Sequence, residues 1–312
     1  MPLHFFKTIL LFSKSDLVPI LGPSLAVAMV LAGPTDIISF ITGFFWLELH
    51  LLTFEIKNQI VGVEEDRLSK PYRPVAAGRL CVSAAQRLYV VVGVCAFAWS
   101  VYLGLALCSA VYMVAIYCYN EGGMSRHWFL KSFLGSIGYV CYCWGTTTIF
   151  DHGNPLSTVS VTAIAMSGLL HVTTGHAQDF RDLEGDAAIG RKTLPMLLPS
   201  SLARWSLALL LATWTSALVR LWAPPAPAAL ALALFALAAV TALVRANSVA
   251  ADRAAYWWYN MWLITAHFLP LFTPARIAAW RAVDPTLFCH EAEALLRPVQ
   301  RATAAILALT SL

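Results

Sequence analysis

The chain has 312 residues, of which 59% are hydrophobic and only 12% are charged. Soluble domains carry about 25% charged residues, so this composition excludes an ordinary soluble protein and indicates lipid as the surrounding solvent. The net charge of +4, without a basic tract interleaved with aromatic residues, gives no indication of nucleic-acid binding.

The N-terminal segment, residues 1–16, reads MPLHFFKTILLFSKSD. Its apolar patch is too short to cross a bilayer, and no small-residue cleavage site follows it. We therefore expect an amphipathic helix at the membrane interface rather than a signal peptide. Because the segment lacks an Arg- and Ser-rich leader, the endoplasmic reticulum is the default location.

Nine apolar runs follow, each close to the ~20 residues that cross a bilayer as a helix. Long runs without alternation favour helices over a barrel. We expect an all-α, polytopic membrane protein with about nine transmembrane helices in a single bundle around a central cavity. This transmembrane domain covers 17–275, and a tail over 276–312, expected to be helical, completes the chain. The runs lie near residues 17–33, 36–57, 86–103, 104–119, 132–150, 156–177, 203–222, 226–245 and 256–273.

Basic residues indicate the orientation of these helices. The connections at 58–86, 120–131, 178–202 and 245–255 contain Lys and Arg, whereas the short turns between the other spans contain none. The positive-inside rule therefore places 58–86 and 178–202 in the cytosol. The arginines after residue 275 break this alternation. The seven cysteines form no C-x-x-C pair, and we expect them to be reduced, with neither a zinc site nor a disulfide.

The first acidic stretch is 58-NQIVGVEEDRLSKPYRP-74, at the end of an apolar run. On one continuous helix, Asn58, Glu65 and Asp66 share a side, and Glu48 falls on that side within the run. Acids that extend into a membrane are costly unless they face water, a cation or a partner. The competing explanation is a solvated helix end with local Glu–Arg pairs.

The second acidic stretch is 176-HAQDFRDLEGDAAIGRKTLP-195. Asp179, Asp182 and Asp186 lie on one side of a helix, and His171 lies on the same side deeper in the span. Three carboxylates in eight residues form a dense set of oxygen ligands for a hard divalent cation. A polar cytosolic loop would explain either stretch alone, but two such stretches at span ends favour a shared site.

Acids and cations together indicate a Mg²⁺-bridged diphosphate. Carboxylates hold Mg²⁺, the metal holds diphosphate oxygens, and basic side chains take up the remaining negative charge. An apolar cavity below such a site suits a prenyl diphosphate. The interleaved basic residues are Lys70, Arg73, Lys131, Arg181, Arg191 and Lys192.

The two stretches resemble the motifs of the UbiA superfamily of intramembrane prenyltransferases, over roughly residues 15–275. This resemblance implies nine helices and two Asp-rich motifs. The first motif, N-x-x-x-D-x-x-x-D followed by K-P-x-R-P, corresponds to Asn58, Gly62, Asp66, Lys70, Pro71, Arg73 and Pro74. The second, D-x-x-G-D-x-x-x-G-R-x-T-L-P, corresponds to Asp182, Gly185, Asp186, Gly190, Arg191, Thr193, Leu194 and Pro195.

One position departs from the family pattern, because Gly62 stands where the first motif has its middle Asp. Glu65 has a better angle to Asn58 than Glu64 has, so we expect Glu65 to replace the lost ligand. This variant, with 46-WLELHLLTFEIKNQ-59, is similar to a fungal branch that includes membrane-bound sesquiterpene cyclases.

The resemblance implies a membrane-embedded, Mg²⁺-dependent terpene cyclase that ionises a prenyl diphosphate, most simply farnesyl diphosphate, and releases diphosphate. The expected catalytic residues are Asp66, Asp182 and Asp186. The expected metal ligands are Asn58, Glu65, Asp66, Asp179, Asp182 and Asp186. The expected diphosphate-binding residues are Lys70, Arg73, Lys131, Arg191 and Lys192.

The cavity that holds the allylic cation is expected to contain aromatic faces and a base. Glu48, Phe54, Tyr139 and His171 are candidates for its wall. Proton loss would go to diphosphate, His171 or Glu48, and an intrahelical hydrogen bond is the competing role for His171. Further candidate rings, each of which could instead face lipid or pack in the bundle, are Phe45, Trp46, Tyr142, Trp144 and Trp258.

Two alternatives remain open from the sequence. A prenyltransferase would use the same ionisation and end with attack by an aromatic or quinone-precursor acceptor. A transporter or lipid-binding helical bundle would use the acidic clusters for ions and release no diphosphate.

Overall fold

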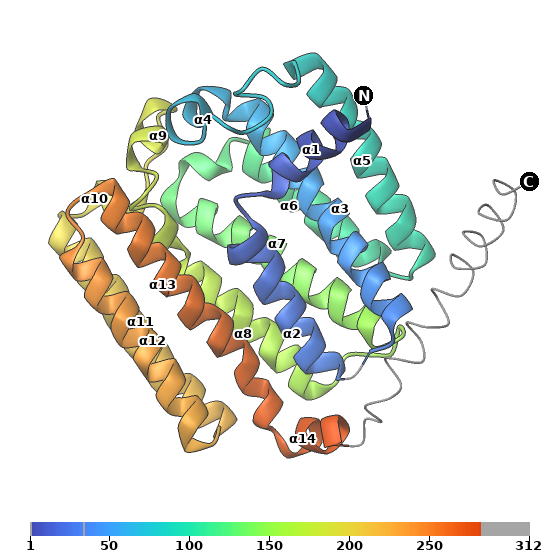
Figure 1. Cartoon of the computed structure of the whole chain (residues 1–312), viewed down its shortest axis with the longest axis vertical. Coiled ribbons are helices and arrows are strands. Elements are labelled where there is room, and N and C mark those ends of the chain that lie inside the picture. Colours follow the sequence, from blue (N-terminus) through green and yellow to red (C-terminus); the bar gives the residue numbers. More distant parts are fainter. Residues whose placement is uncertain (1, 34, 282–312) are drawn as a thin grey trace, which may run out of the picture.

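A computed structural model describes residues 2–33 and 35–281, with side chains from residue 7 onward. The described chain is helical, as expected, and its helices associate in one bundle (Figure 1). Most of the expected helical tail over 276–312 lies outside the described residues, which end with α14. The helices are α1 (Pro2–Ser13), α2 (Gly22–Ala32), α3 (Ile37–Val61), α4 (Val63–Ser69), α5 (Val82–Tyr102), α6 (Ala106–Asn120), α7 (Trp128–Phe150), α8 (Thr158–Thr174), α9 (Leu183–Ala188), α10 (Leu194–Leu197), α11 (Ser200–Trp222), α12 (Ala226–Arg245), α13 (Val249–Phe268) and α14 (Pro274–Arg281).

Each of the nine expected spans falls on a helix, but the count of nine membrane crossings is not confirmed. Among the described residues, five helices are long and apolar enough to cross a membrane: α3, α5, α8 with its 3₁₀ extension, α11 and α12. A sixth crossing results if the bent pair 7–13 and 17–32 is one span. α6 has only 15 residues. α7 and α13, with 23 and 20 residues, contribute polar side chains to an internal cavity, which lowers their hydropathy.

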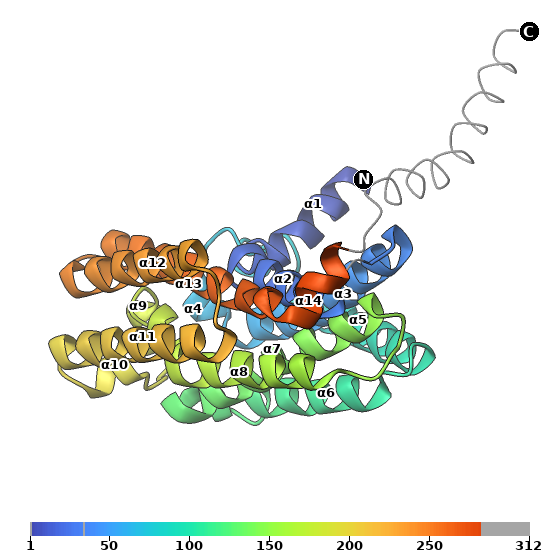
Figure 2. The same cartoon turned by 90° about the horizontal axis from the view of Figure 1, so that it is seen from below.

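The helices around the cavity pack closely, because glycines allow near approach at two crossings. α7 contacts α2, α3, α6 and α8, and α13 contacts α2 and α12 (Figures 1 and 2). A side chain on Gly145 would begin 2.0 Å from the Trp46 ring, and one on Gly168 would begin 2.7 Å from Val140. These contacts fix α3 and α8 against α7, on either side of the cavity.

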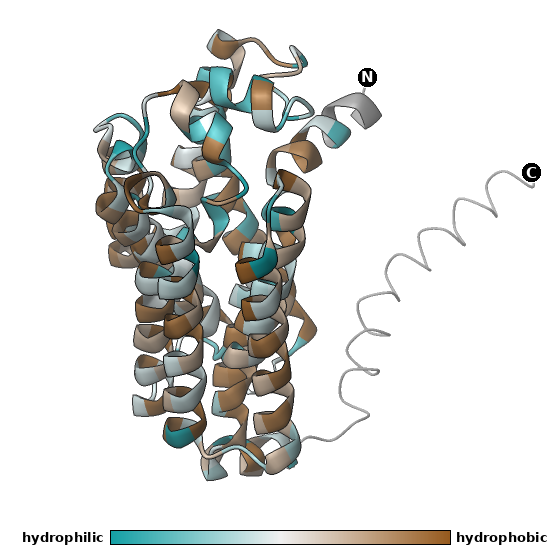
Figure 3. Cartoon of the chain, turned by 90° about the vertical axis from the view of Figure 1, so that its left-hand side faces the viewer, coloured by the Kyte–Doolittle hydropathy of each residue, from teal (hydrophilic) through white to brown (hydrophobic). Residues whose placement is uncertain are grey.

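One end of the bundle is polar, as the hydropathy colouring shows (Figure 3). The short helices α4 and α9 pack against each other there and bring the two acidic stretches together (Figure 1). This approach depends on Gly185, because a side chain at that position would begin 3.0 Å from Cγ of Glu65.

The N-terminal helix packs against α3 rather than standing apart. Phe12 is fully buried in a cluster with Leu52, Ile56 and Val75. The chain then bends by 61° and continues through a π-helical turn, Leu17–Leu21, into α2. The interfacial location expected for residues 1–16 stays a prediction.

Candidate active site

A single pocket at the polar end joins both acidic stretches to the interior of the bundle. Its outer wall is charged, and its inner wall is aromatic and weakly polar. The outer wall includes Ser15, Asp16, Glu55, Asn58, Glu65, Lys70, Arg73, Lys131, Arg181, Asp182 and Arg191. The inner wall includes Phe54, Tyr119, Tyr139, Tyr142, His171, Tyr256, Tyr259, Asn260 and Leu263.

The first motif is divided between two helices. α3 ends at Val61, Gly62 is the residue between, and α4 begins at Val63. Glu65 and Asp66 therefore lie in the first turn of α4 and are both buried. A side chain on Gly62 would begin 3.3 Å from Oε2 of Glu65, so the Glu65 carboxylate occupies space beside this glycine.

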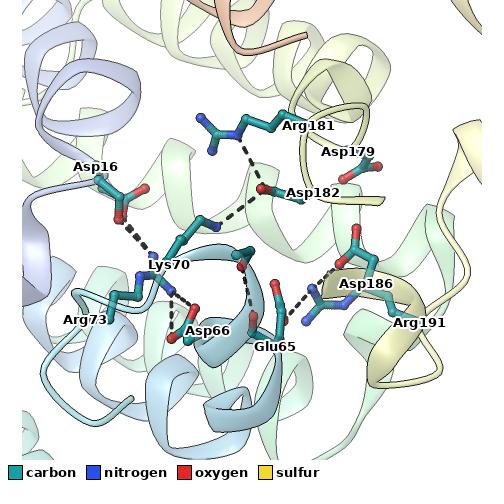
Figure 4. Close-up of polar contacts among 12 residues, drawn as sticks. Asp16, Glu65, Asp66, Lys70, Arg73, Asp179, Arg181, Asp182, Asp186 and Arg191 are labelled. Atoms are coloured by element: carbon teal, nitrogen blue, oxygen red, sulfur yellow. Dashed lines mark hydrogen bonds and ion pairs between the residues drawn. The ribbon is translucent and has the colours of Figure 1, made fainter. Parts of the chain in front are cut away.

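Arg73 is the centre of the contacts made by the first motif (Figure 4). Its guanidinium donates to Asp66 Oδ1 at 3.1 Å and to Ser15 Oγ at 2.9 Å, and lies 3.1 Å from Glu55 Oε2. Asp16 Oδ2 is 3.6 Å away. Burial raises the pKa of Asp66 to about 6, although Arg73 and Lys70 oppose that shift.

Lys131 and Arg191 hold the second motif. Lys131 Nζ donates to Asp179 Oδ1 at 2.6 Å and to Asp186 Oδ2 at 3.2 Å. Arg191 donates to Asp186 Oδ1 at 2.6 Å and to Glu65 Oε2 at 3.2 Å, so one guanidinium joins the two motifs (Figure 4). Burial raises the pKa of Asp179 to about 6, against the attraction of Lys131.

Asp182, the first aspartate of the second motif, lines the pocket and contacts Lys70 of the first motif. Its Oδ2 is 3.5 Å from Lys70 Nζ and 3.4 Å from Arg181 Nε. Burial alone would raise its pKa, but Lys70 and Arg181 outweigh burial and lower it. Arg181 in turn lies 4.0 Å from the centre of the Tyr256 ring.

The charges of this cluster do not balance. Seven carboxyl groups face five cations, an excess of two acids. The Nε atoms of Arg73 and Arg191 are buried and have no hydrogen-bond partner among the residues that the structure describes. Excess carboxylates suit a divalent cation, and unsatisfied guanidinium donors suit phosphate oxygens. Among the side chains that the structure describes, no three acids, histidines or cysteines are arranged as a metal cluster. Each acid of the second motif is in contact with a cation instead.

The structure divides the expected site residues into three groups. Ten line the pocket: Phe54, Asn58, Glu65, Lys70, Arg73, Lys131, Tyr139, His171, Asp182 and Arg191. Asp66, Asp179 and Asp186 lie behind that wall, each bonded to a cation that lines it. Glu48 and Lys192 are not brought to the pocket: Glu48 accepts a 2.6 Å hydrogen bond from Ser13, and Lys192 is exposed.

The expected aromatic residues are similarly divided. Tyr142 lines the pocket together with Phe54 and Tyr139. Phe45 is 54% exposed, and Trp46 is buried against His50. Trp144 and Trp258 pack at the margin of the hydrophobic core.

Several wall residues were missed from the sequence. Asp16 reaches the pocket only because the chain bends before α2. Tyr256, Tyr259 and Asn260 lie on one face of α13, and their spacing of three and four residues within an apolar run was the available signal.

Comparison with known proteins places this chain in a family. A sequence model described as the UbiA prenyltransferase family matches residues 20–264. The chain is 45% identical to fumagillin beta-trans-bergamotene synthase of Aspergillus fumigatus over 276 residues, which cover 88% of this chain and 96% of that one. It is 33% identical to a diterpene cyclase of Hericium erinaceus over 163 residues, 49% of each chain.

The fold is also that of solved structures. A UbiA homologue from Archaeoglobus fulgidus, bound to GPP and Mg²⁺, matches with a TM-score of 0.62 and 13% identity, covering 88% of this chain and all of that one. The family and the apolar helices make the chain an integral membrane protein. It belongs to the UbiA prenyltransferase family.

Proposed function

We propose that this protein is a divalent-metal-dependent terpene cyclase, which ionises farnesyl diphosphate and converts it to a cyclic sesquiterpene with release of diphosphate. The observation that carries the proposal is the pocket itself, which joins a charged outer wall to an aromatic interior. The 45% identity to a bergamotene synthase over nearly its whole length supports cyclisation rather than another outcome.

Mg²⁺ is the proposed metal, and the UbiA homologue with bound GPP and Mg²⁺ supports that choice. Asn58 and Glu65 of the first motif, with Asp182 on the opposite wall, would hold it in the pocket. Three acids lie behind the wall: Asp66, Asp179 and Asp186. They would become additional metal ligands when the cations that now hold them turn toward the phosphate groups. When bound, the metal neutralises charge that develops on the departing diphosphate.

The basic residues supply the second part of the site. Lys131, Arg191, Lys70 and Arg73 are held by acids, and they line the pocket that the substrate would occupy. A diphosphate offers these donors stronger acceptors, including the unpaired Nε atoms of the two arginines. The carboxylates released in this exchange are then free to bind metal. Lys192 has no part in this arrangement.

The interior of the pocket would shield the allylic cation from water. Tyr142 is fixed by a hydrogen bond to Tyr112, whose hydroxyl also donates to the His50 carbonyl at 2.8 Å. An adjoining apolar pocket, which shares Phe54, Tyr119 and Tyr142 with the main one, offers room for the prenyl tail. Ring faces stabilise a nearby cation electrostatically.

Glu65 takes the place of the missing motif aspartate in this proposal. Its carboxylate lies where a side chain at Gly62 would point, and it already contacts Arg191 of the second motif. An acid three residues further along the chain therefore reaches the same region, from the start of α4 instead of the end of α3.

The experiment uses purified protein with farnesyl diphosphate and Mg²⁺, without an acceptor. We expect cyclic hydrocarbon in the organic extract, in proportion to the diphosphate released, and loss of both when the metal is chelated. Linear alcohols alone, with a prenylated product once an aromatic acceptor is added, would support the alternative of a prenyltransferase, which the family description favours. Binding without diphosphate release would exclude both enzymes.

The location proposed is the endoplasmic reticulum, with the polar end in the cytosol. The connections that contain α4 and α9 carry Lys and Arg and lie at that end (Figure 3). Protease protection of an epitope in the loop after α4 tests this orientation in microsomes: an epitope in the cytosol is digested in intact vesicles.

A further inference from the structure

Three histidines in the bundle make the same type of hydrogen bond through Nδ1, but the surroundings of their Nε2 atoms differ. Nδ1 of His50, His171 and His267 lies 2.7–3.0 Å from the backbone carbonyl four residues earlier. A carbonyl only accepts, so Nδ1 carries the proton in each ring. In the neutral imidazole, Nε2 is then left with a lone pair.

The environment of Nε2 distinguishes His171. In His50, Nε2 is hydrogen-bonded to the Ser109 hydroxyl at 2.9 Å. In His267 it is enclosed without a partner. In His171 it has no hydrogen-bond partner among the side chains that the structure describes, and it is not an enclosed atom either. Because His171 lines the pocket, its lone pair is accessible from inside it.

The ring of His171 is held in place at depth. It stacks on Tyr139 with 3.6 Å between centroids and 23° between planes. Going outward from His171, Gly175, Gln178 and Asp182 also line the pocket. The histidine is seven residues before Gln178, which puts it on the order of 10 Å further into the bundle.

No carboxylate competes with His171 in the inner part of the pocket as described. Its neighbours there are Tyr139, Tyr259, Asn260 and Leu263, and neither a phenol nor an amide is an effective base. The acids that line the pocket are each within 3.6 Å of a cation, so an ion pair already holds them: Asp16, Glu55, Glu65 and Asp182. A cyclised cation in this chamber therefore faces a neutral nitrogen lone pair, which is the most basic group among these lining residues.

We infer that His171 Nε2 accepts the proton that ends the cyclisation, an inference that rests on the proposed function. The substrate C–O bond breaks first, and its electron pair leaves with diphosphate. After ring closure, the electron pair of a C–H bond next to the cationic carbon becomes the new C=C bond, and the proton moves to the Nε2 lone pair. The imidazolium stacked on Tyr139 returns this proton to water once diphosphate has left the pocket.

The test compares His171→Asn and His171→Phe with the wild type. Asn keeps an N–H near the Ser167 carbonyl, and Phe keeps a ring against Tyr139, but both remove the base. Each protein receives farnesyl diphosphate and Mg²⁺, and cyclic hydrocarbon is measured per diphosphate released. We expect release to continue while this ratio falls by at least about tenfold in both variants, with alcohols or differently terminated products replacing the hydrocarbon.

The matched control is His267→Asn, which removes a histidine with the same Nδ1 bond and a contact to the same Tyr139 ring, outside this pocket. Its ratio should stay within about twofold of the wild type. An unchanged ratio in either His171 variant, or an equal fall in His267→Asn, overturns the assignment of His171 alone. A wild-type protein that releases no diphosphate, or makes no cyclic hydrocarbon, overturns the proposed function and this inference with it.

Discussion

Two groups of buried ion pairs lie at the polar end of the bundle, and they differ in how their charges are matched. Arg204 and Asp252 form a closed pair with contacts of 2.6 and 3.2 Å. Arg204 also donates to the Leu243 carbonyl and stacks on Phe180, so nearly every donor is used. In the described part of the candidate site, seven acids share five cations, and two guanidinium Nε atoms have no partner.

This difference distinguishes an ion pair that holds two helices together from ion pairs whose members can bind a metal and a substrate instead of each other. Arg204 and Asp252 join α11 to α13 with one cation for one anion, and neither lines the candidate active-site pocket. The acids of the site are oversupplied, so a divalent cation and an anionic substrate can enter with little net change of charge. Burial alone would not have distinguished the two groups.

The largest expected effect is on turnover. Asp182→Asn and Asp186→Asn should each lower diphosphate release by more than about 100-fold, because each removes a charge that the metal needs. Steady-state release from farnesyl diphosphate, normalised to folded protein, measures this. Asp252→Asn is the control and should retain turnover per folded molecule. Wild-type rates in Asp182→Asn would mean that the metal is held elsewhere.

For stability, the larger effect is expected at the Arg204–Asp252 pair rather than in the candidate site. Asp252→Asn or Arg204→Met leaves an uncompensated buried charge and should cost about 3–5 kcal/mol of unfolding free energy. Equilibrium unfolding in detergent measures the loss, and the double change Arg204→Met with Asp252→Leu should recover part of it. Asp179→Asn, which removes one of the excess acids at a position where burial raises the carboxyl pKa, should cost less. Equal losses at both places would remove the distinction drawn above.

A smaller effect is expected within the first motif. Glu65 is buried and contacts Arg191, whereas Glu64 is exposed and pairs with Arg67 on the surface. Glu65→Gln should lower turnover by about 10- to 100-fold, and Glu64→Gln should change it by less than about twofold. The Mg²⁺ concentration for half-maximal rate should rise only in Glu65→Gln. The opposite order would show that Glu65 does not replace the missing motif aspartate.

The smallest expected effect is a dependence on pH. Burial raises the pKa of Asp66 and of Asp179 to about 6, so both hold protons more tightly in the folded chain than in the unfolded one. Their protonation favours the metal-free fold below pH 6 and competes with metal. From pH 7 to pH 5, Mg²⁺ affinity should therefore fall. Over the same range, the melting temperature of the metal-free wild type should rise relative to that of the double variant Asp66→Asn with Asp179→Asn, which lacks both titrating groups. A difference between the two proteins that does not change with pH would contradict the role of these acids.

The sequence predicted the helices better than it predicted the count of membrane crossings. Every apolar run lies on a helix because its length and hydropathy are local properties. α7 and α13 do not count as apolar crossings, since they place Lys131 and Asn260 at the cavity. A helix that faces a polar cavity loses the composition by which a membrane span is recognised.

The sequence predicted that the two acidic stretches come together, and the contact between α4 and α9 bears this out, but it did not predict the exact partners of the motif residues. The sequence placed Asn58 and Asp66 on one face of a continuous helix, whereas α3 ends at Val61 and α4 starts at Val63. Asp66 consequently turns to Arg73 and lies behind the wall. The place of Asp16 in the pocket wall could not be predicted for another reason. Asp16 lies more than forty residues before the first motif, and a bend in the chain brings it to the pocket.

The short distance between Gly62 and the Glu65 carboxylate has a consequence for how such a site changes through substitution. An aspartate at 62 would start 3.3 Å from an acid already present, so regaining the family residue would crowd two like charges before it improved ligation. With Glu65 as a metal ligand, as proposed, its loss before such a change would remove a ligand from the first motif. A replacement at either position alone is therefore expected to be unfavourable, although the two motif patterns differ by one glycine.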